Sequence, residues 1–419
     1  MNRLIHKQRV PDNSELSDRG SKGILEFVFH LRFSQWMLLI YPVFLFAIRR
    51  RRYFDEAYSI DTSAYLQIIF SCVVGLYALK QILSGNYNLR QLLFRRPLVW
   101  LMFYYLLAIF SGVWAERPMY TLYRSFEILV FFVLIVDALA SLDLNNMLKF
   151  QALFGLVLII SWHFSSLFYW FSFKSLHNPL VSGTVIYLVF LGLLLQGIRW
   201  KILYAIIILS VLLATSSASY LALLLGMGGT IIFSSGGKRF LGLGLILFVS
   251  LVILTYGINF IDIIFWGKSE QNIMTMSGRI PVWQWVYDQY VLQRPYFGYG
   301  FGMGETLARI FNFSGLRMQH MHNVVMGALT NLGFVGLTLF LIFLFDNTIL
   351  MIKEKNFPHR SIFIGGGLAL ALNAMSISSL TSPISFGFIG QVLFVVMIAC
   401  GLNGMTFKSK DPSHSKNIT

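Results

Sequence analysis

Long apolar runs separated by short polar loops constrain this chain more than any other feature. Each run is close to the roughly 20 residues that an α-helix needs to cross a hydrocarbon layer of about 30 Å. With 56% hydrophobic and only 12% charged residues, the sequence predicts an all-α, polytopic membrane protein rather than a water-soluble one. We expect twelve transmembrane helices, near residues 33–48, 63–83, 97–114, 122–140, 149–171, 180–198, 201–217, 219–235, 240–258, 324–350, 361–380 and 385–403.

Basic residues indicate how these helices are oriented. The chain has 33 Lys and Arg against 18 Asp and Glu, a net charge of +15, but the basic residues lie mostly between the apolar runs. They therefore act as topology signals and as candidate anion ligands, and no nucleic-acid partner is expected. With both termini inside, 21 of the 33 lie inside and 12 outside, as the positive-inside rule favours. Arg49 to Arg52 fall outside in this topology, so the side of these arginines and the first helix stay open.

This topology divides the chain into five segments. They are a cytoplasmic N-terminal tail (1–32), helices one to nine (33–261), an extracytoplasmic loop (262–323), helices ten to twelve (324–403) and a cytoplasmic tail (404–419). Because the tail lacks a short apolar core and a small-residue cleavage site, it is not a signal peptide. Cys72 and Cys400 lie inside apolar runs, so neither a disulfide framework nor a thiolate metal site is expected. The long outer loop is the segment with room for chemistry.

The first half of that loop predicts a helix along the membrane surface. Ser277 is a candidate cap and Pro281 fits the first helical turn. The helical period places apolar and aromatic side chains on one face, at the depth of the lipid headgroups. This face holds Trp283, Val286, Tyr287, Tyr290 and Val291.

Arg279 stands just before this helix. Unpaired backbone N–H groups and the helix dipole favour an anion there, and a guanidinium suits a phosphate or pyrophosphate. The alternative is that Arg279 only contacts lipid headgroups or a neighbouring carbonyl.

After the helix, Arg294 and Pro295 lead into YFGYGFGMG, where glycines alternate with larger residues. The spacing does not fit a dinucleotide or P-loop motif. Such glycines let the backbone approach a ligand or a helix closely, and sugar rings stack well on the aromatic residues. A purely structural turn explains the pattern equally well.

His320 and His322 precede the tenth helix, and Asn323 follows them where the chain enters the bilayer. Two histidines two residues apart are poor zinc geometry on a helix, and no carboxylate cluster lies nearby, so no metal is expected. A histidine at this boundary titrates near neutral pH and can act as a general base toward a hydroxyl group. The alternative is an interfacial histidine that hydrogen-bonds to the backbone.

Taken in order, the motifs of the outer loop resemble those of the O-antigen ligase and O-antigen or exopolysaccharide polymerase superfamily of membrane glycosyltransferases. The resemblance rests on SGRIPVW, RPYFGYGFG, HMHN and NLGFVGL, in the loop between two late helices. Two earlier segments, SGVWAERPMYTLYRS (111–125) and HNPLVSG (177–183), are similar to further family motifs.

The resemblance implies a GT-C-like helical fold in the bacterial inner membrane, with the active site facing the periplasm. It implies a donor glycan carried on undecaprenyl pyrophosphate, a glycan or lipid A core acceptor, and a chain-length regulator protein as a partner. Arg279 matches the family's pyrophosphate-binding arginine, and His322 matches the histidine that activates the acceptor hydroxyl or assists the leaving pyrophosphate, with Asn323 orienting it. We place Arg124, Arg117, His320, Arg294 and Asn178 with the substrate-binding residues; Arg124 alternatively snorkels to the membrane surface.

The chain departs from the family pattern at two positions. Ala218 stands where a second phosphate-binding arginine is expected, and Asn331 stands where an acidic residue often occurs. The first departure casts doubt on a strict ligase mechanism unless another arginine, such as Arg124, replaces the charge.

We therefore expect a metal-independent, cofactor-free and inverting glycosyltransferase. Pyrophosphate is a good leaving group, so two arginines and one base suffice without paired carboxylates. A polymerase is favoured over a ligase, and a transporter is the rival from another class. Transporters place ionisable groups at the bilayer midplane; here such groups are few, and we expect Glu127, His163 and Asp346 to be packed and hydrogen-bonded.

Overall fold

The computed structural model is helical, apart from one short hairpin, in the part of the chain that it describes. It describes residues 24–48, 62–84, 87–140, 142–167, 183–213, 216–234, 274–276, 278–308, 312–313, 316–317, 323–353, 359–374 and 386–407.

Nine helices or turns form the first half of the bundle. They are α2 (Ile24–Phe29), α3 (Phe33–Ile48), α4 (Thr62–Leu83), α5 (Tyr87–Leu93), α6 (Leu98–Phe110), the 3-10 turn η2 (Ser111–Val113), α7 (Pro118–Ala140), α8 (Leu144–Leu167) and α10 (Leu188–Leu191).

The remaining elements include the loop between the two halves of the chain. They are the 3-10 turn η4 (Gly192–Leu194), α11 (Ile198–Leu213), α12 (Ser217–Ile232), α16 (Arg279–Val286), the π-helical η5 (Tyr287–Val291), α17 (Met303–Ala308), β1 (Asn312–Phe313), β2 (Leu316–Arg317), α18 (Val324–Lys353), α19 (Arg360–Ala374) and α20 (Phe386–Phe407). The two strands pair antiparallel, with Asn312 opposite Arg317.

Helices occur where the apolar runs predicted them, with two differences among the described residues. The run at 180–198 is helical only in short pieces, among them α10 and η4, and α18 is broken at Gly333. The expected helix at 240–258 and Arg49 to Arg52 lie outside the described residues. Three described helices are long and apolar enough to cross a membrane, over Ala64–Leu83, Leu144–Ser161 and Val324–Lys353. The number twelve stays a prediction.

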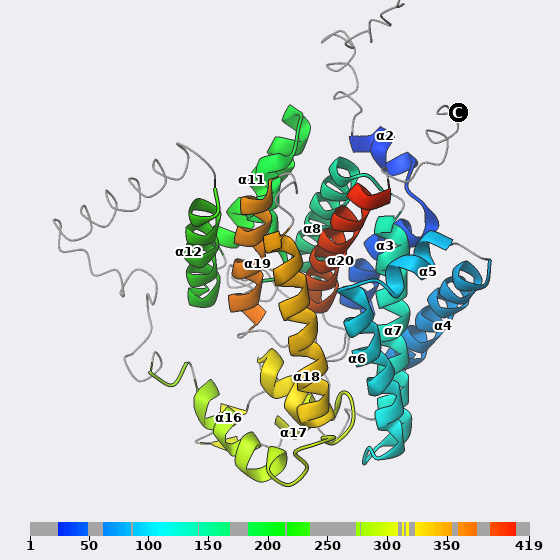
Figure 1. Ribbon diagram of the computed structural model, residues 1–419, viewed down its shortest axis with the longest axis vertical. Coiled ribbons are helices and arrows are strands. Elements are labelled where there is room, and N and C mark those ends of the chain that lie inside the picture. Colours follow the sequence, from blue (N-terminus) through cyan, green and yellow to red (C-terminus); the bar gives the residue numbers. More distant parts are fainter. Residues whose placement is uncertain are drawn as a thin grey trace, which may run out of the picture.

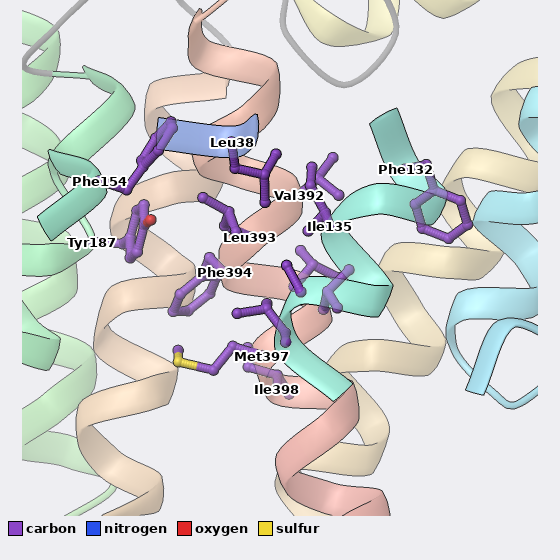
Figure 2. Close-up of a cluster of buried hydrophobic side chains, with 14 of the residues drawn as sticks. Leu38, Phe132, Ile135, Phe154, Tyr187, Val392, Leu393, Phe394, Met397 and Ile398 are labelled. Carbon is purple, nitrogen blue, oxygen red and sulfur yellow. The ribbon is translucent and has the colours of Figure 1, made fainter. Parts of the chain in front are cut away.

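Helix α7 is the centre of the bundle and packs against α3, α4, α5, α6 and α20. Its middle, from Val130 to Leu139, is buried throughout, as expected for a helix that is apolar on every side. Figure 2 shows part of this core, where Ile135 of α7 lies near Val392 of α20. Such a core holds α7 and α20 in fixed relative positions.

Small residues bring α12 and α19 close together. A Cβ atom at Gly226 of α12 would lie 2.7 Å from the carbonyl oxygen of Gly365 in α19. Without a hydrophobic driving force between helices in lipid, close packing of this kind is a main source of helix association. The glycines therefore explain why these two short helices pair.

The two ends of the bundle differ in what they carry. Figure 1 shows α2 and the last turns of α20 at one end, and α16 and α17 at the opposite end. The described part of the outer loop thus lies far from both described chain ends. This arrangement is the one expected if both tails and the loop lie on opposite sides of a membrane.

Candidate functional site

The site region begins with a break in α18. Gly333 has φ 63° and ψ −160°, a conformation outside the helical region that glycine adopts more readily than other residues. In an uninterrupted helix, the amides of Phe334 and Val335 would donate to the carbonyls of Thr330 and Asn331. The break separates these four groups, and each one needs another partner.

The segment after η5 supplies those partners. Phe334 N–H donates to the carbonyl of Pro295 at 2.7 Å, and Val335 N–H donates to that of Tyr296 at 3.2 Å. In return, the carbonyls of Thr330 and Asn331 accept hydrogen bonds from the amides of Tyr299 and Gly300, each at 2.9 Å. The loop therefore replaces both lost helical hydrogen bonds, as a polar backbone in an apolar bundle requires.

The alternating glycines make this close approach possible. Gly298, Gly300 and Gly302 all have positive φ, at 63°, 100° and 84°. A Cβ atom at Gly298 would lie 2.7 Å from the carbonyl carbon of Asn331, and one at Gly300 would collide with the side chain of Ala115. These glycines bring the backbone against α18 and the segment after η2, which is the structural alternative considered for this motif.

Asn331 has a structural role in this region. Its buried side-chain oxygen Oδ1 accepts a hydrogen bond from Gly304 N–H at 2.8 Å, at the start of α17. A second anchor, Ser111 Oγ in η2, accepts a hydrogen bond from Phe301 N–H at 3.0 Å. Sequence reasoning missed both anchoring roles, because a serine and an asparagine in apolar helices look alike whether or not a distant loop reaches them.

The early motif at 111–125 meets the loop directly. The indole Nε1 of Trp114 donates to the carbonyl oxygen of Phe297 at 3.0 Å, and the two rings meet edge to face at 5.6 Å between centroids. Tyr120 of α7 packs against the cluster of Tyr299, Met303 and Leu307. Two motifs that are more than 150 residues apart in the sequence thus form one unit.

Helix α16 forms in the predicted place, with a different cap and a different buried face. Gly278, in a left-handed conformation with φ 81°, is the N-cap residue instead of Ser277. The helix continues as the π-helical η5, so that Val286 and Val291, five residues apart, are both buried. Tyr287, expected on the buried face, is 40% exposed.

Arg279 is the first residue of α16 and is half-buried. Burial lowers the pKa of its guanidinium, because desolvation penalises the charged form. The helix dipole also disfavours a cation at an N-terminus. Arg279 takes part in neither of two ion pairs seen between described residues, Arg96–Asp346 and Arg124–Glu127. A bound anion would relieve both penalties.

Asn323 is the buried N-cap of α18. Its Oδ1 accepts hydrogen bonds from the amides of Val325 at 2.9 Å and Met326 at 3.1 Å. The capping fixes the start of α18. His322 and His320, which precede it in the sequence, lie outside the described residues, as does Asn178.

Arg124 lies in the first turns of α7 with its side chain 20% exposed and forms an ion pair with the buried carboxylate of Glu127 at 2.8 Å. The rings of Tyr120 and Tyr123 flank its guanidinium at 5.5 and 5.2 Å. Arg117 is exposed just before this helix. Arg124 is therefore next to the loop through Tyr120, and its charge is already opposed by one carboxylate.

Arg294 is exposed at the end of η5 and lies over the ring of Tyr299, 4.7 Å from Cζ to the ring centroid. Burial raises the pKa of Tyr299 and outweighs the opposing effect of Arg294, so the phenol stays protonated. Its hydroxyl group donates to Gln293 Oε1 at 3.4 Å.

An open cleft of about 640 Å³ lies beside this pair. It is lined by Trp114, Gln293, Arg294, Pro295, Tyr296, Phe297 and Gly298.

The ionisable residues inside the bundle have structural partners where their side chains are described. The carboxylate of Asp346 accepts two hydrogen bonds from the guanidinium of Arg96, at 2.7 and 3.0 Å, and a third from Trp100 Nε1 at 3.1 Å. Glu127 is paired with Arg124. Both are packed and hydrogen-bonded, as predicted; the side chain of His163 lies outside the described part. Among the described residues, no three His, Cys, Asp or Glu side chains gather into a possible metal site.

Comparison with known families places part of the chain beside a known family. Residues 202–341 match a family model described as O-antigen ligase. The matched region runs from α11 through the loop to the middle of α18 and contains Arg279, His322, Asn323 and Asn331. Arg117, Arg124 and Asn178 lie before it. No curated protein matches the chain.

Proposed function

We propose that this chain, whose residues 202–341 match a family model described as O-antigen ligase, transfers an undecaprenyl-pyrophosphate-linked glycan to an acceptor sugar as an O-antigen or exopolysaccharide polymerase. The match supports a glycosyltransferase-like integral membrane enzyme of surface polysaccharide biosynthesis, with a lipid-linked glycan and an acceptor as substrates. The match over the loop and the start of α18 is the observation that carries the proposal.

The reaction takes place at the periplasmic face of the inner membrane, and the loop at 262–323 is extracytoplasmic in a chain of twelve transmembrane helices. The separation of α2 and the end of α20 from α16 and α17 supports this placement. The charge distribution of the sequence supports the same orientation.

Arg279 binds the pyrophosphate of the donor. A half-buried arginine at a helix N-terminus, outside the ion pairs of the described residues, suits an anion that brings two negative charges close to it. As the bond to the anomeric carbon breaks, charge grows on the leaving pyrophosphate, and the guanidinium stabilises that charge more in the transition state than in the ground state.

His322 removes the proton from the acceptor hydroxyl or assists the leaving group. In the sequence it directly precedes Asn323, whose side chain caps the start of α18. Asn323 orients it, as the family resemblance implies. His320, Arg294, Asn178, Arg117 and Arg124 contribute to binding of the substrates.

Arg279 and one further arginine replace a metal ion in this mechanism. Attack by the acceptor hydroxyl on the face opposite the pyrophosphate inverts the anomeric configuration, without a covalent enzyme intermediate. An α-linked donor therefore gives a β-linked product.

A ligase that delivers the glycan to lipid A core is the second candidate, because the matching family model carries that description. The half-buried Ala218 in the first turn of α12 replaces an arginine expected in ligases. For this reason the polymerase is preferred.

Variants of the two proposed catalytic residues test the chemistry. In nanodiscs with a lipid-linked glycan and an acceptor, Arg279→Ala and His322→Ala should each lower kcat/KM about 100-fold or more, with Arg279→Lys in between because lysine keeps the charge but not the bidentate geometry. Arg199→Ala, an exposed arginine outside the matched region, is the control and should behave as wild type. Full activity of both alanine variants would overturn the proposal.

A deletion strain separates polymerase from ligase. Loss of a polymerase should leave single repeat units on the acceptor, whereas loss of a ligase should leave long chains on the carrier lipid. Gel analysis of the surface polysaccharide distinguishes the two patterns, and complementation with the wild-type gene is the control.

A further inference from the structure

The cleft beside Arg294 holds two aromatic rings in solvent-exposed positions. Tyr296 is 69% and Phe297 is 53% exposed. Their backbone carbonyls accept hydrogen bonds from Val335 and Trp114, and the neighbouring Pro295 is bound to Phe334. These hydrogen bonds hold the backbone that carries the two rings at the surface of the bundle.

Polar groups border the same cleft. Arg294 is kept in place by the ring of Tyr299 at 4.7 Å, and Gln293 accepts a hydrogen bond from the Tyr299 hydroxyl group. The lining thus combines flat apolar faces with a guanidinium and an amide. An acyl chain would give these two polar groups no hydrogen bonds, whereas a ligand rich in hydroxyl groups would.

The cleft lies at the opposite end of a helical segment from Arg279. Arg279 and Val291 mark the two ends of a continuous segment of thirteen residues, α-helical and then π-helical, which at the α-helical rise of 1.5 Å per residue would span at most about 18 Å. The cleft begins two residues later, at Gln293. A ligand that reached from one to the other would be several sugar units long.

We propose that this cleft is a distal subsite for the glycan chain of a substrate. The apolar faces of sugar rings stack on Tyr296 and Phe297, and their hydroxyl groups bond to Arg294 and Gln293. The inference rests on the proposed glycan transfer and adds a preference for long glycans. The chain in the cleft belongs either to the donor or to the acceptor.

The test compares short and long glycans in the full-length protein in nanodiscs. The probes are a donor and an acceptor carrying the shortest glycan that the wild type uses, and the same molecules extended by several repeat units. The wild type should show a higher kcat/KM for the extended form of one substrate. The variant Tyr296→Leu/Phe297→Leu keeps the apolar surface but removes the flat faces. Its ratio of kcat/KM for the extended form over the short form should be about tenfold lower than in the wild type, and its kcat/KM with the short forms should be unchanged.

The two arms identify the glycan. Loss of the advantage only with extended donors assigns the cleft to the donor glycan, and loss only with extended acceptors assigns it to the acceptor. Tyr296→Phe/Phe297→Tyr should retain the advantage. Tyr65→Leu/Phe345→Leu, which changes rings that are 58% and 65% exposed elsewhere, is the matched control and should also retain it.

Three results would overturn the inference. The first is an unchanged length advantage in the double leucine variant, which would mean that the rings only contact lipid. The second is an equal loss of kcat/KM with short and long glycans in that variant. The third is the absence of a length advantage in the wild type. Failure of the proposed function looks different, because then the wild type transfers no glycan of any length.

Discussion

At the scale of single residues, Arg124 and Glu127 form a part-buried ion pair that the sequence did not reveal. The position of Arg124 at a membrane boundary predicts a phosphate ligand. In the structure it pairs with a carboxylate that is 1% exposed. Removing one partner of such a pair leaves an uncompensated buried charge, which costs more than the intact pair contributes.

Arg124→Gln should therefore lower the free energy of unfolding by about 3 kcal/mol, and adding Glu127→Gln should restore most of it. Thermal unfolding in detergent measures both effects. The double variant also tests substrate binding: if Arg124 contacts the donor phosphate, this stable protein should still show a raised donor KM. Wild-type stability of Arg124→Gln would contradict the structural role.

At the scale of elements, the broken α18 and the loop segment 295–300 form one unit. Each supplies the backbone hydrogen bonds that the other lacks. The unit joins the end of η5 to α18. Helix α16, which begins at Arg279, continues directly into η5, and α18 begins at Val324, two residues after His322 in the sequence. Arg279 and the capping residue Asn323 are thus attached to one hydrogen-bonded unit of backbone.

Gly333→Ala should disrupt this unit, because the new Cβ atom would collide with the backbone of Tyr296 at a φ that alanine avoids. We expect a fall in melting temperature and a fall in transfer activity. Gly228→Ala in α12 is the matched control; its Cβ meets nothing within 4 Å. Removing a helical glycine there should be neutral or stabilise by up to about 1 kcal/mol. Equal melting temperatures for the two variants would show that the break is not needed.

At the scale of the whole molecule, the proposed topology places α16 to α17 and the chain ends on opposite sides of the membrane. In a background of Cys72→Ser and Cys400→Ala, a membrane-impermeant thiol reagent applied to spheroplasts should label Gln289→Cys in η5. Arg199→Cys at the start of α11 should react only after the membrane is opened. Both positions are exposed, so access alone does not explain a difference. Labelling of Arg199→Cys in intact spheroplasts would contradict the proposed orientation.

The sequence by itself determined the features that depend on local composition. Apolar runs predicted most described helices within a few residues, and SGRIPVW predicted the helix that begins at Arg279. The order of motifs predicted the family that residues 202–341 match. These signals are readable because hydrophobic periodicity and short motifs involve residues that are close in the chain.

Only the tertiary structure decided what depends on contacts between distant segments. The pairing of Asp346 with Arg96 joins residues 250 positions apart, and the hydrogen bond from Trp114 to Phe297 joins residues 183 apart. The glycines of YFGYGFG fit a ligand or a helix equally well until α18 is seen to break at Gly333 and accept their backbone. The physical reason is that a backbone group buried in an apolar bundle must find a partner, and local sequence does not say which distant segment supplies it.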